Sequence, residues 1–179
     1  MRTRLLNFVV YQVAWFAVLI CAARGIAWAG AAAAVVAVAI HAPVWRSRIE
    51  RQLIVACLLA GLLVDSTLAI TGQVHYAGWH LPLAPFWMLS LWAAFATTLN
   101  HSMRWLMQRP AVAALGGAIG GPLAYLAGER LGALQLAAAH SALPTALTAI
   151  ALLWAPALWA LSVLVMRATS AQPTGEVPA

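Results

Sequence analysis

The arginines of this chain are segregated with respect to six hydrophobic segments, and the sequence contains no lysine. Only Arg24 and Arg130 fall on one side of these segments. The other eight arginines fall on the opposite side: Arg2, Arg4, Arg46, Arg48, Arg51, Arg104, Arg109 and Arg167. Because basic residues in short loops set the orientation of membrane proteins, the pattern predicts that both termini face the cytoplasm.

Each hydrophobic segment approaches the length of about 20 residues that a helix needs to cross a bilayer. The segments cover residues 5–23, 26–45, 53–72, 82–101, 111–128 and 145–166. The composition, 64% hydrophobic and 8% charged, is typical of membrane proteins. We therefore predict an all-α membrane protein, a bundle of six transmembrane helices in the inner membrane. Residues 1–167 form a single polytopic membrane domain in this interpretation, and residues 168–179 form a disordered cytoplasmic tail.

The net charge of +6 has a plain explanation in arginines that flank membrane spans and contact anionic lipid headgroups. Since no basic run with interleaved aromatic residues occurs, nucleic-acid binding is not expected. Cys21 and Cys57 lie inside predicted spans and are expected to be free thiols. A cleaved signal peptide is an alternative for the first segment, but Asn7 and Gln12 interrupt its apolar region, which favours an uncleaved helix.

Asp65 lies about two-thirds of the way along the third span, towards its outer end. An ionisable residue at such depth costs about 2.5–3.5 kcal/mol on insertion scales unless it is paired, protonated or hydrated. Gly61 and Gly72 share its helix face, so another helix can approach closely and Asp65 should face the bundle interior. Two interpretations stay open: a functional group that contacts a ligand, or a structural anchor bonded to Arg24, Arg130 or a neighbouring hydroxyl.

The fifth span is rich in glycine. Gly116 with Gly120, and Gly117 with Gly121, form overlapping pairs of small residues four positions apart, which permit tight helix packing. Pro122 follows them and should kink or break the helix. Interrupted helices near the middle of a membrane line ligand sites in transporters, and simple packing with tolerated kinks is the alternative.

Depth and helical phase suggest a pocket at the outer mouth of the bundle. Tyr125 and Glu129 lie one turn apart on the same face of the fifth span. The predicted ligand-binding set is Asp65, Tyr125, Glu129, Trp79, His80, Arg24 and Arg130. The alternative is an ordinary hydrated loop layer in which the charged residues contact water.

No catalytic constellation is recognisable in the sequence. His75 and His80 share a loop without further ligands at metal spacing, so neither a metal site nor a cofactor is predicted there or elsewhere. A second polar set in the cytoplasmic half is expected to be structural: Asn7, Gln12, His41, Asn100 and His101.

Several motifs together resemble the DUF2878-like family of uncharacterised small bacterial inner-membrane proteins. They are Asn7-Phe8 with Gln12 and Trp15, Pro85-x-Trp87, Leu91-Trp92-x-x-Phe95-Ala96 and Gly120-Gly121-Pro122-x-x-Tyr125-x-x-Gly128-Glu129. The resemblance covers nearly the whole chain and implies a compact helical bundle of bacterial, Gram-negative origin. It supplies no activity and no functional residues. Members often occur near genes for modifying membrane fatty acids, which implies an accessory role connected with lipids.

Three functions follow as hypotheses. The first is a non-enzymatic protein that binds a lipid or hydrophobic small molecule, or assists a membrane-lipid pathway. The second is a substrate-capture or transport subunit similar to the binding components of vitamin importers, with a membrane protein partner. The third is a membrane-embedded enzyme that uses Asp65, Glu129 or His80 as acid or base.

Overall fold

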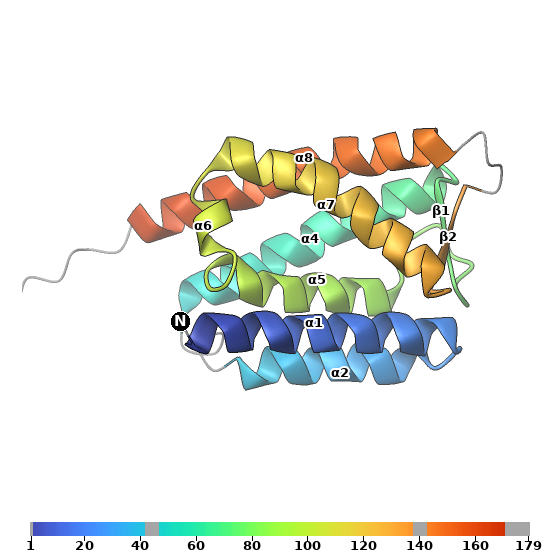
Figure 1. Ribbon diagram of the computed structural model, residues 1–179, viewed down its shortest axis with the longest axis horizontal. Helices are drawn as coiled ribbons and strands as arrows, with labels where there is room; N and C mark the ends of the chain where they lie inside the picture. Colours follow the sequence, from blue (N-terminus) through green and yellow to red (C-terminus); the bar gives the residue numbers. More distant parts are fainter. Residues whose placement is uncertain (1, 42–46, 138–142, 171–179) are drawn as a thin grey trace, which may run out of the picture.

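The computed structural model describes residues 2–41, 47–137 and 143–170, and its described part is a bundle of helices lying side by side (Figure 1). In chain order the long elements are α1 (Arg2–Ala23), α2 (Ala27–Ile40), α4 (Arg48–Ile70), α5 (Phe86–Leu99), α7 (Pro110–Arg130) and α8 (Leu143–Ser170). A single turn, α6 (Arg104–Met107), lies between α5 and α7. Of the predicted disordered tail, residues 168–170 continue α8, and residues 171–179 lie outside the described residues.

Four of these helices, α1, α4, α7 and α8, are long and apolar enough to cross a membrane. The other two predicted spans form shorter helices of 14 residues each. At 1.5 Å per residue, α2 and α5 measure about 21 Å, less than the ~30 Å of a hydrocarbon core. The helix α5 begins at Phe86 because Pro85 adopts an extended conformation, whereas hydropathy alone placed its start as early as Pro82.

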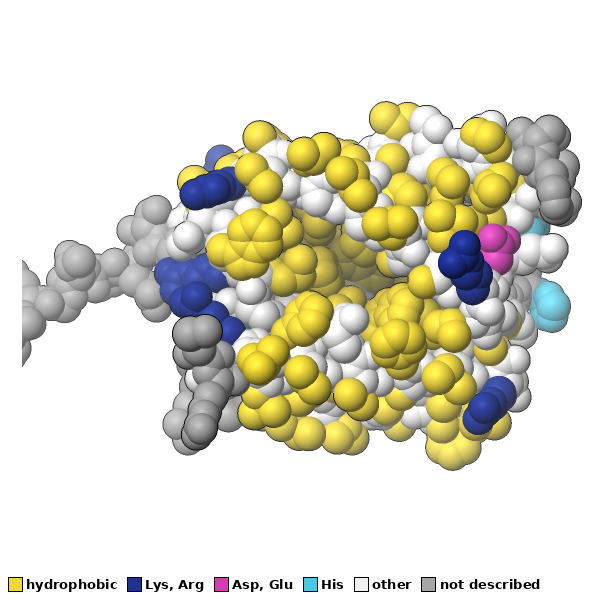
Figure 2. Space-filling view, viewed as in Figure 1, with side chains coloured by type: hydrophobic (Ala, Val, Ile, Leu, Met, Phe, Trp, Pro, Cys, Tyr) yellow, Lys and Arg dark blue, Asp and Glu magenta, His cyan; other side chains and the backbone are white. Residues whose placement is uncertain are grey.

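The outward faces of the long helices are apolar. Large hydrophobic side chains such as Leu63 on α4 and Leu152 on α8 are each 69% exposed, and the face drawn in Figure 2 is covered largely by hydrophobic side chains. In contrast, ten of the 14 residues of α5 are buried, because this helix packs against α1, α2 and α4. The short helix α5 therefore lies in the centre of the bundle.

The described arginines lie at the two ends of the bundle. Seven described arginines lie at or next to the beginnings of α1, α4 and α7, in α6 and in the last turn of α8. These elements meet at one end of the bundle, which we call the arginine-rich end (Figures 1 and 2). Arg24 follows α1 and Arg130 ends α7, at the opposite end. The sequence pattern is thus reproduced in space.

The opposite end, which we call the strand end, carries two short strands that the sequence did not reveal. The strands β1 (Val74–Tyr76) and β2 (Leu134–Leu136) pair antiparallel, with His75 opposite Gln135. In each strand the first and third side chains are buried and the middle one is exposed. Each strand follows a long helix, α4 or α7, so the pair links the ends of these two helices (Figure 1).

The helices α4 and α7 end with the same hydrogen-bond arrangement. After α4, Gly72 has a φ of 67° and the N–H of Gln73 donates to the carbonyl of Leu68 at 2.9 Å. After α7, Gly132 has a φ of 81° and the N–H of Ala133 donates to the carbonyl of Gly128 at 3.0 Å. A glycine in the left-handed conformation at this position reverses the chain with little strain, and here it directs each chain into its strand.

One of the two glycine pairs of α7 lies directly against α8. A Cβ added at Gly117 would lie 2.5 Å from the carbonyl oxygen of Trp154, and one at Gly121 would lie 2.6 Å from Cγ of the same residue. Gly116 and Gly120 face elsewhere, and a Cβ at Gly120 would meet nothing within 4 Å. The close approach of α7 and α8 therefore depends on the pair Gly117 and Gly121.

Two prolines lie in the interior of continuous helices. Pro122 is within α7 and Pro156 within α8, and Figure 1 shows α7 bending near its middle. Because proline donates no backbone hydrogen bond and its ring crowds the preceding turn, Pro122 explains a bend at this place. The helix bends there without being interrupted.

Candidate ligand site in the bundle interior

Asp65 on α4 is completely buried and accepts three hydrogen bonds from neutral side chains. The hydroxyl of Tyr76 on β1 donates to Oδ1 at 2.6 Å, and the indole N–H of Trp92 on α5 donates to Oδ2 at 2.7 Å. The hydroxyl of Tyr125 on α7 also donates to Oδ1. The carboxylate therefore connects α4 with β1, α5 and α7 through two hydroxyls and an indole. A buried acid needs such donors to offset the loss of water.

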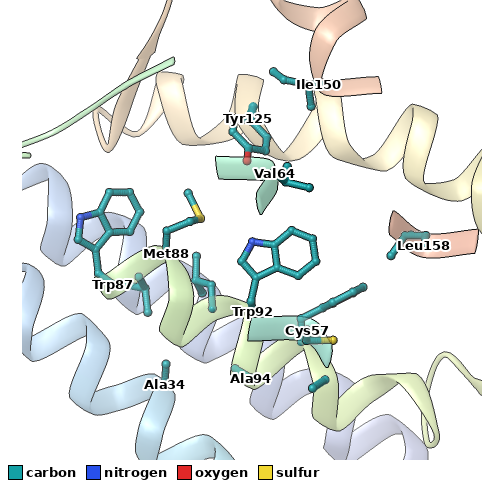
Figure 3. Close-up of a cluster of buried hydrophobic side chains, with 14 of the residues drawn as sticks. Ala34, Cys57, Val64, Trp87, Met88, Trp92, Ala94, Tyr125, Ile150 and Leu158 are labelled. Atoms are coloured by element: carbon teal, nitrogen blue, oxygen red, sulfur yellow. The ribbon is translucent and has the colours of Figure 1, made fainter. Parts of the chain in front are cut away.

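The polar groups of the network converge from different helices. Figure 3 shows the Tyr125 hydroxyl and the Trp92 nitrogen directed towards the segment of α4 that carries Val64, the residue before Asp65. Gly61, one turn earlier on α4, leaves the space that the Trp92 ring occupies. Burial raises the pKa of Tyr76 well above its usual range, so this hydroxyl keeps its proton and acts as a donor.

Next to this network, a cleft enters the bundle between α1 and α7. Figure 2 shows this face hollowed, with hydrophobic side chains on the walls. The lining residues come from α1, α5, α7, β2 and α8: Tyr11, Trp15, Leu19, Met88, Leu91, Trp92, Phe95, Ala124, Tyr125, Leu134 and Trp154. The cavity at its base measures about 50 Å³, room for only a few water-sized groups. The cleft can therefore admit a slender part of an apolar molecule.

Trp154 of α8 lines the cleft and has an unpaired donor. Its ring stacks on that of Trp92 with centroids 4.6 Å apart, and it meets the ring of Tyr125 edge-on at 6.3 Å. Its indole nitrogen is buried and, among the described residues, makes no hydrogen bond of ordinary geometry; the hydroxyl of Tyr125 is its polar neighbour. A buried N–H without an acceptor is costly, and a ligand oxygen would supply one.

The structure brings together two of the seven residues that the sequence suggested for the pocket, Asp65 and Tyr125. The other five belong to the strand end. Glu129 accepts a hydrogen bond from the backbone N–H of Leu136, Trp79 donates to the carbonyl of Leu83, and Arg24, His80 and Arg130 are exposed. Within the described ranges, no hydrogen bond or ion pair joins Asp65 to any of these five residues. Their role in ligand binding stays a prediction.

Comparison with known proteins identifies the family. Residues 4–160 match the family described as "Protein of unknown function (DUF2878)". The chain belongs to this family. The matched range contains the whole Asp65 network and Trp154. No curated protein and no solved structure matches the chain.

Three residues of this DUF2878 site were not assigned to it from the sequence: Tyr76, Trp92 and Trp154. Trp92 stood in a motif that carried the family resemblance, and Tyr76 is one of only three tyrosines in the chain. The approach of Tyr76 and Trp92 to Asp65 depends on the pairing of β1 with β2 and on the central position of α5, and Trp154 of α8 meets the site by stacking on Trp92. Neither feature has a periodic signature in the sequence.

Proposed function

We propose that this protein is a six-span protein of the bacterial inner membrane, with both termini in the cytoplasm, that binds a lipid or other hydrophobic small molecule. The ligand enters the cleft between α1 and α7 sideways from the hydrocarbon. Four helices of sufficient length and apolarity support the membrane location. The short helices α2 and α5 are apolar, and α5 is enclosed by protein over most of its surface, which is compatible with a shorter span.

The observation that carries the proposal is the indole N–H of Trp154, which makes no hydrogen bond of ordinary geometry among the described residues and belongs to a predominantly apolar cleft. Ligand sites are predominantly apolar, with a few polar groups that fix the orientation of the ligand. A ligand with an apolar body and one oxygen acceptor, such as an ester, ketone or hydroxyl, would satisfy this donor. The small cavity indicates that only the polar part inserts, while the rest of the ligand lies along α1 and α7.

Asp65 has a supporting role in this proposal. Its carboxylate already accepts three hydrogen bonds and it is completely buried. These bonds hold Trp92 and Tyr125, which form part of the cleft wall. Trp92 in turn stacks on Trp154 and keeps its ring in place. The site is therefore a preformed binding surface, and it contains no acid–base pair positioned for catalysis among the described residues.

The test is mass spectrometry of small molecules that copurify with the protein in mild detergent. We expect a discrete species, enriched over bulk membrane lipid, in the wild type. Trp154→Phe preserves the aromatic stack and removes the donor, so retention of this species should fall about five- to tenfold, as expected for one hydrogen bond of about 1–1.4 kcal/mol. Trp105→Phe is the matched control, because Trp105 is 63% exposed on α6 and is not among the residues that line the cleft.

Equal retention by Trp154→Phe and the wild type would contradict the assignment of this donor. Bulk phospholipid alone in every sample would contradict ligand binding itself. The comparison of the two tryptophan variants separates a specific effect on the cleft from a general effect of losing an indole.

A second candidate is a substrate-capture subunit that docks on a membrane partner. An apolar groove of about 480 Å³ between α4 and α8 favours this alternative. Small residues line much of it, including Ala56 and Ala60 on α4 and Ala157 and Ala160 on α8, and small residues permit close approach of another helix. Recovery of a partner ATPase by crosslinking from Ala60→Cys would favour transport over a lipid-binding accessory protein.

A further inference from the structure

Three metal-ligating side chains meet near the arginine-rich end, away from the cleft. His41 follows α2, Glu50 lies in the first turn of α4, and His101 follows α5. The Nε2 atom of His101 lies 3.2 Å from Oε1 of Glu50, and Nε2 of His41 lies 3.8 Å from Oε2. One ligand atom from each residue lies within 4.8 Å of the others. Within the described ranges this is the one such group of three found.

The cluster is held by its surroundings. The side-chain amide of Asn100 donates to Oε1 of Glu50 at 2.9 Å, and Glu50 is only 3% exposed. The two imidazole rings meet edge-on with centroids 4.4 Å apart. Ser102, next to His101, donates to the side chain of Asn7 on α1 at 2.7 Å. The turn that carries His101 is therefore fixed to α1 as well as to α4.

The hydrogen bonding of the cluster is incomplete. The Nε2 atom of His41 is buried and has no hydrogen-bond partner in the described part of the chain, since 3.8 Å to Glu50 is too long. The side-chain oxygen of Asn100 is likewise buried and unpartnered. Two polar atoms thus remain without hydrogen-bond partners among the described residues around a buried carboxylate. A cation among them would satisfy the carboxylate and the His41 nitrogen together.

We propose that His41, Glu50 and His101 bind one divalent transition-metal ion. Two imidazole nitrogens and a carboxylate oxygen are ligands that zinc, iron and manganese accept, at about 2.0–2.2 Å for zinc. Because the ligand atoms now lie 3.2–3.8 Å from the carboxylate oxygens, small side-chain rotations bring them around one ion. Asn100 orients the carboxylate from outside the coordination sphere, as partners of metal ligands commonly do.

The site has an open side. A cavity of about 300 Å³ beside α1 and α2 is lined by both histidines, together with Asn7 and Thr97. Three protein ligands leave coordination positions free, and this cavity gives water or a small ligand access to them. The arrangement therefore corresponds to an accessible metal site. This proposed metal site differs from the structural role that the sequence suggested for His41 and His101. Nothing in the sequence indicated that Glu50 lies beside them.

The test measures Zn²⁺ binding to the full chain purified in detergent with a tag that contains no histidine. The protein is treated with a chelator, reloaded with Zn²⁺, and analysed for metal content and by isothermal titration; Co²⁺ absorption then reports the coordination. We expect one ion per chain. His41→Gln, Glu50→Gln and His101→Gln should each weaken Zn²⁺ binding at least tenfold.

The chain offers a matched control in His75→Ala/His80→Ala. These two histidines are exposed at the strand end, so their removal should leave the single Zn²⁺ site unchanged. Gel filtration and thermal unfolding of each variant without metal establish that the variants are folded. In addition, Zn²⁺ should raise the unfolding temperature of the wild type and of the control but not that of His101→Gln.

Failure of the wild type to bind Zn²⁺ or Co²⁺ above background would overturn the proposal. So would equal binding by the wild type and the three cluster variants, or a loss of binding confined to the His75→Ala/His80→Ala control. If one cluster variant does not fold, the other two still decide the question, because each removes a different ligand.

Discussion

Gly61 and Trp92 occupy complementary positions in the bundle interior: the indole of Trp92 lies where a side chain at position 61 would be. A Cβ at Gly61 would lie 2.2 Å from Cδ1 of Trp92. One turn further along α4, Asp65 accepts the indole N–H. The glycine and the acid therefore act together, since one provides the space and the other provides the hydrogen bond that fixes α5 against α4.

Gly61→Ala should destabilise the protein by about 1–3 kcal/mol, because overpacking forces the indole to move and weakens its bond to Asp65. Thermal unfolding in detergent measures this effect. Gly120→Ala is the control, since a Cβ there would meet nothing within 4 Å and alanine favours the helix. If both variants unfolded at the same temperature, close contact at Gly61 would not be important.

Asp65→Asn should lower stability by about 1–3 kcal/mol, because an amide replaces one acceptor oxygen with a donor and leaves a buried hydroxyl or indole unpaired. Tyr76→Phe removes only one of the three donors, so its effect should be smaller. Both values come from unfolding curves under identical detergent conditions. A fully stable Asp65→Asn variant would instead indicate that the network contributes little to folding.

Glu129→Ala should loosen the strand end. The carboxylate of Glu129 accepts the backbone N–H of Leu136 at 2.9 Å, and its loss should cost about 1 kcal/mol. Hydrogen–deuterium exchange should become faster in residues 134–136. Glu129→Gln retains an acceptor oxygen, so exchange close to that of the wild type is expected. Unchanged exchange in Glu129→Ala would show that the pairing of β1 with β2 is stable without the Glu129 side chain.

The orientation can be tested by labelling single cysteines. In a background with Cys21→Ser and Cys57→Ser, His80→Cys at the strand end should react with a membrane-impermeant thiol reagent in intact cells. Thr3→Cys at the arginine-rich end should react only after the cells are broken. Both positions are exposed. Labelling of Thr3→Cys in intact cells would reverse the predicted orientation.

The features that the sequence predicted well are local ones. Hydropathy located the helices, and the arginine count separated the two ends of the bundle, because each signal comes from neighbouring residues. Helix lengths were less accurate. The fourth span was expected to begin at Pro82 or Pro85 and to end at His101, and α5 runs from Phe86, directly after Pro85, to Leu99, since a polypeptide can be apolar without being helical.

The composition of the sites could not be predicted in the same way. Tyr76 reaches Asp65 only because β1 pairs with β2, and a three-residue strand has no recognisable period. His41, Glu50 and His101 are separated by up to 60 residues and converge only when α2, α4 and α5 pack together. Metal motifs defined by short spacings cannot detect such a group.

The stacking of Trp92 on Trp154 gives the cleft an optical signature. Two indoles with centroids 4.6 Å apart and planes inclined by 29° have coupled electronic transitions, which produce a near-ultraviolet circular dichroism signal characteristic of their geometry. A molecule that enters beside Trp154 changes this coupling without any added label. The stacked pair is therefore expected to act as a spectroscopic reporter of the proposed ligand.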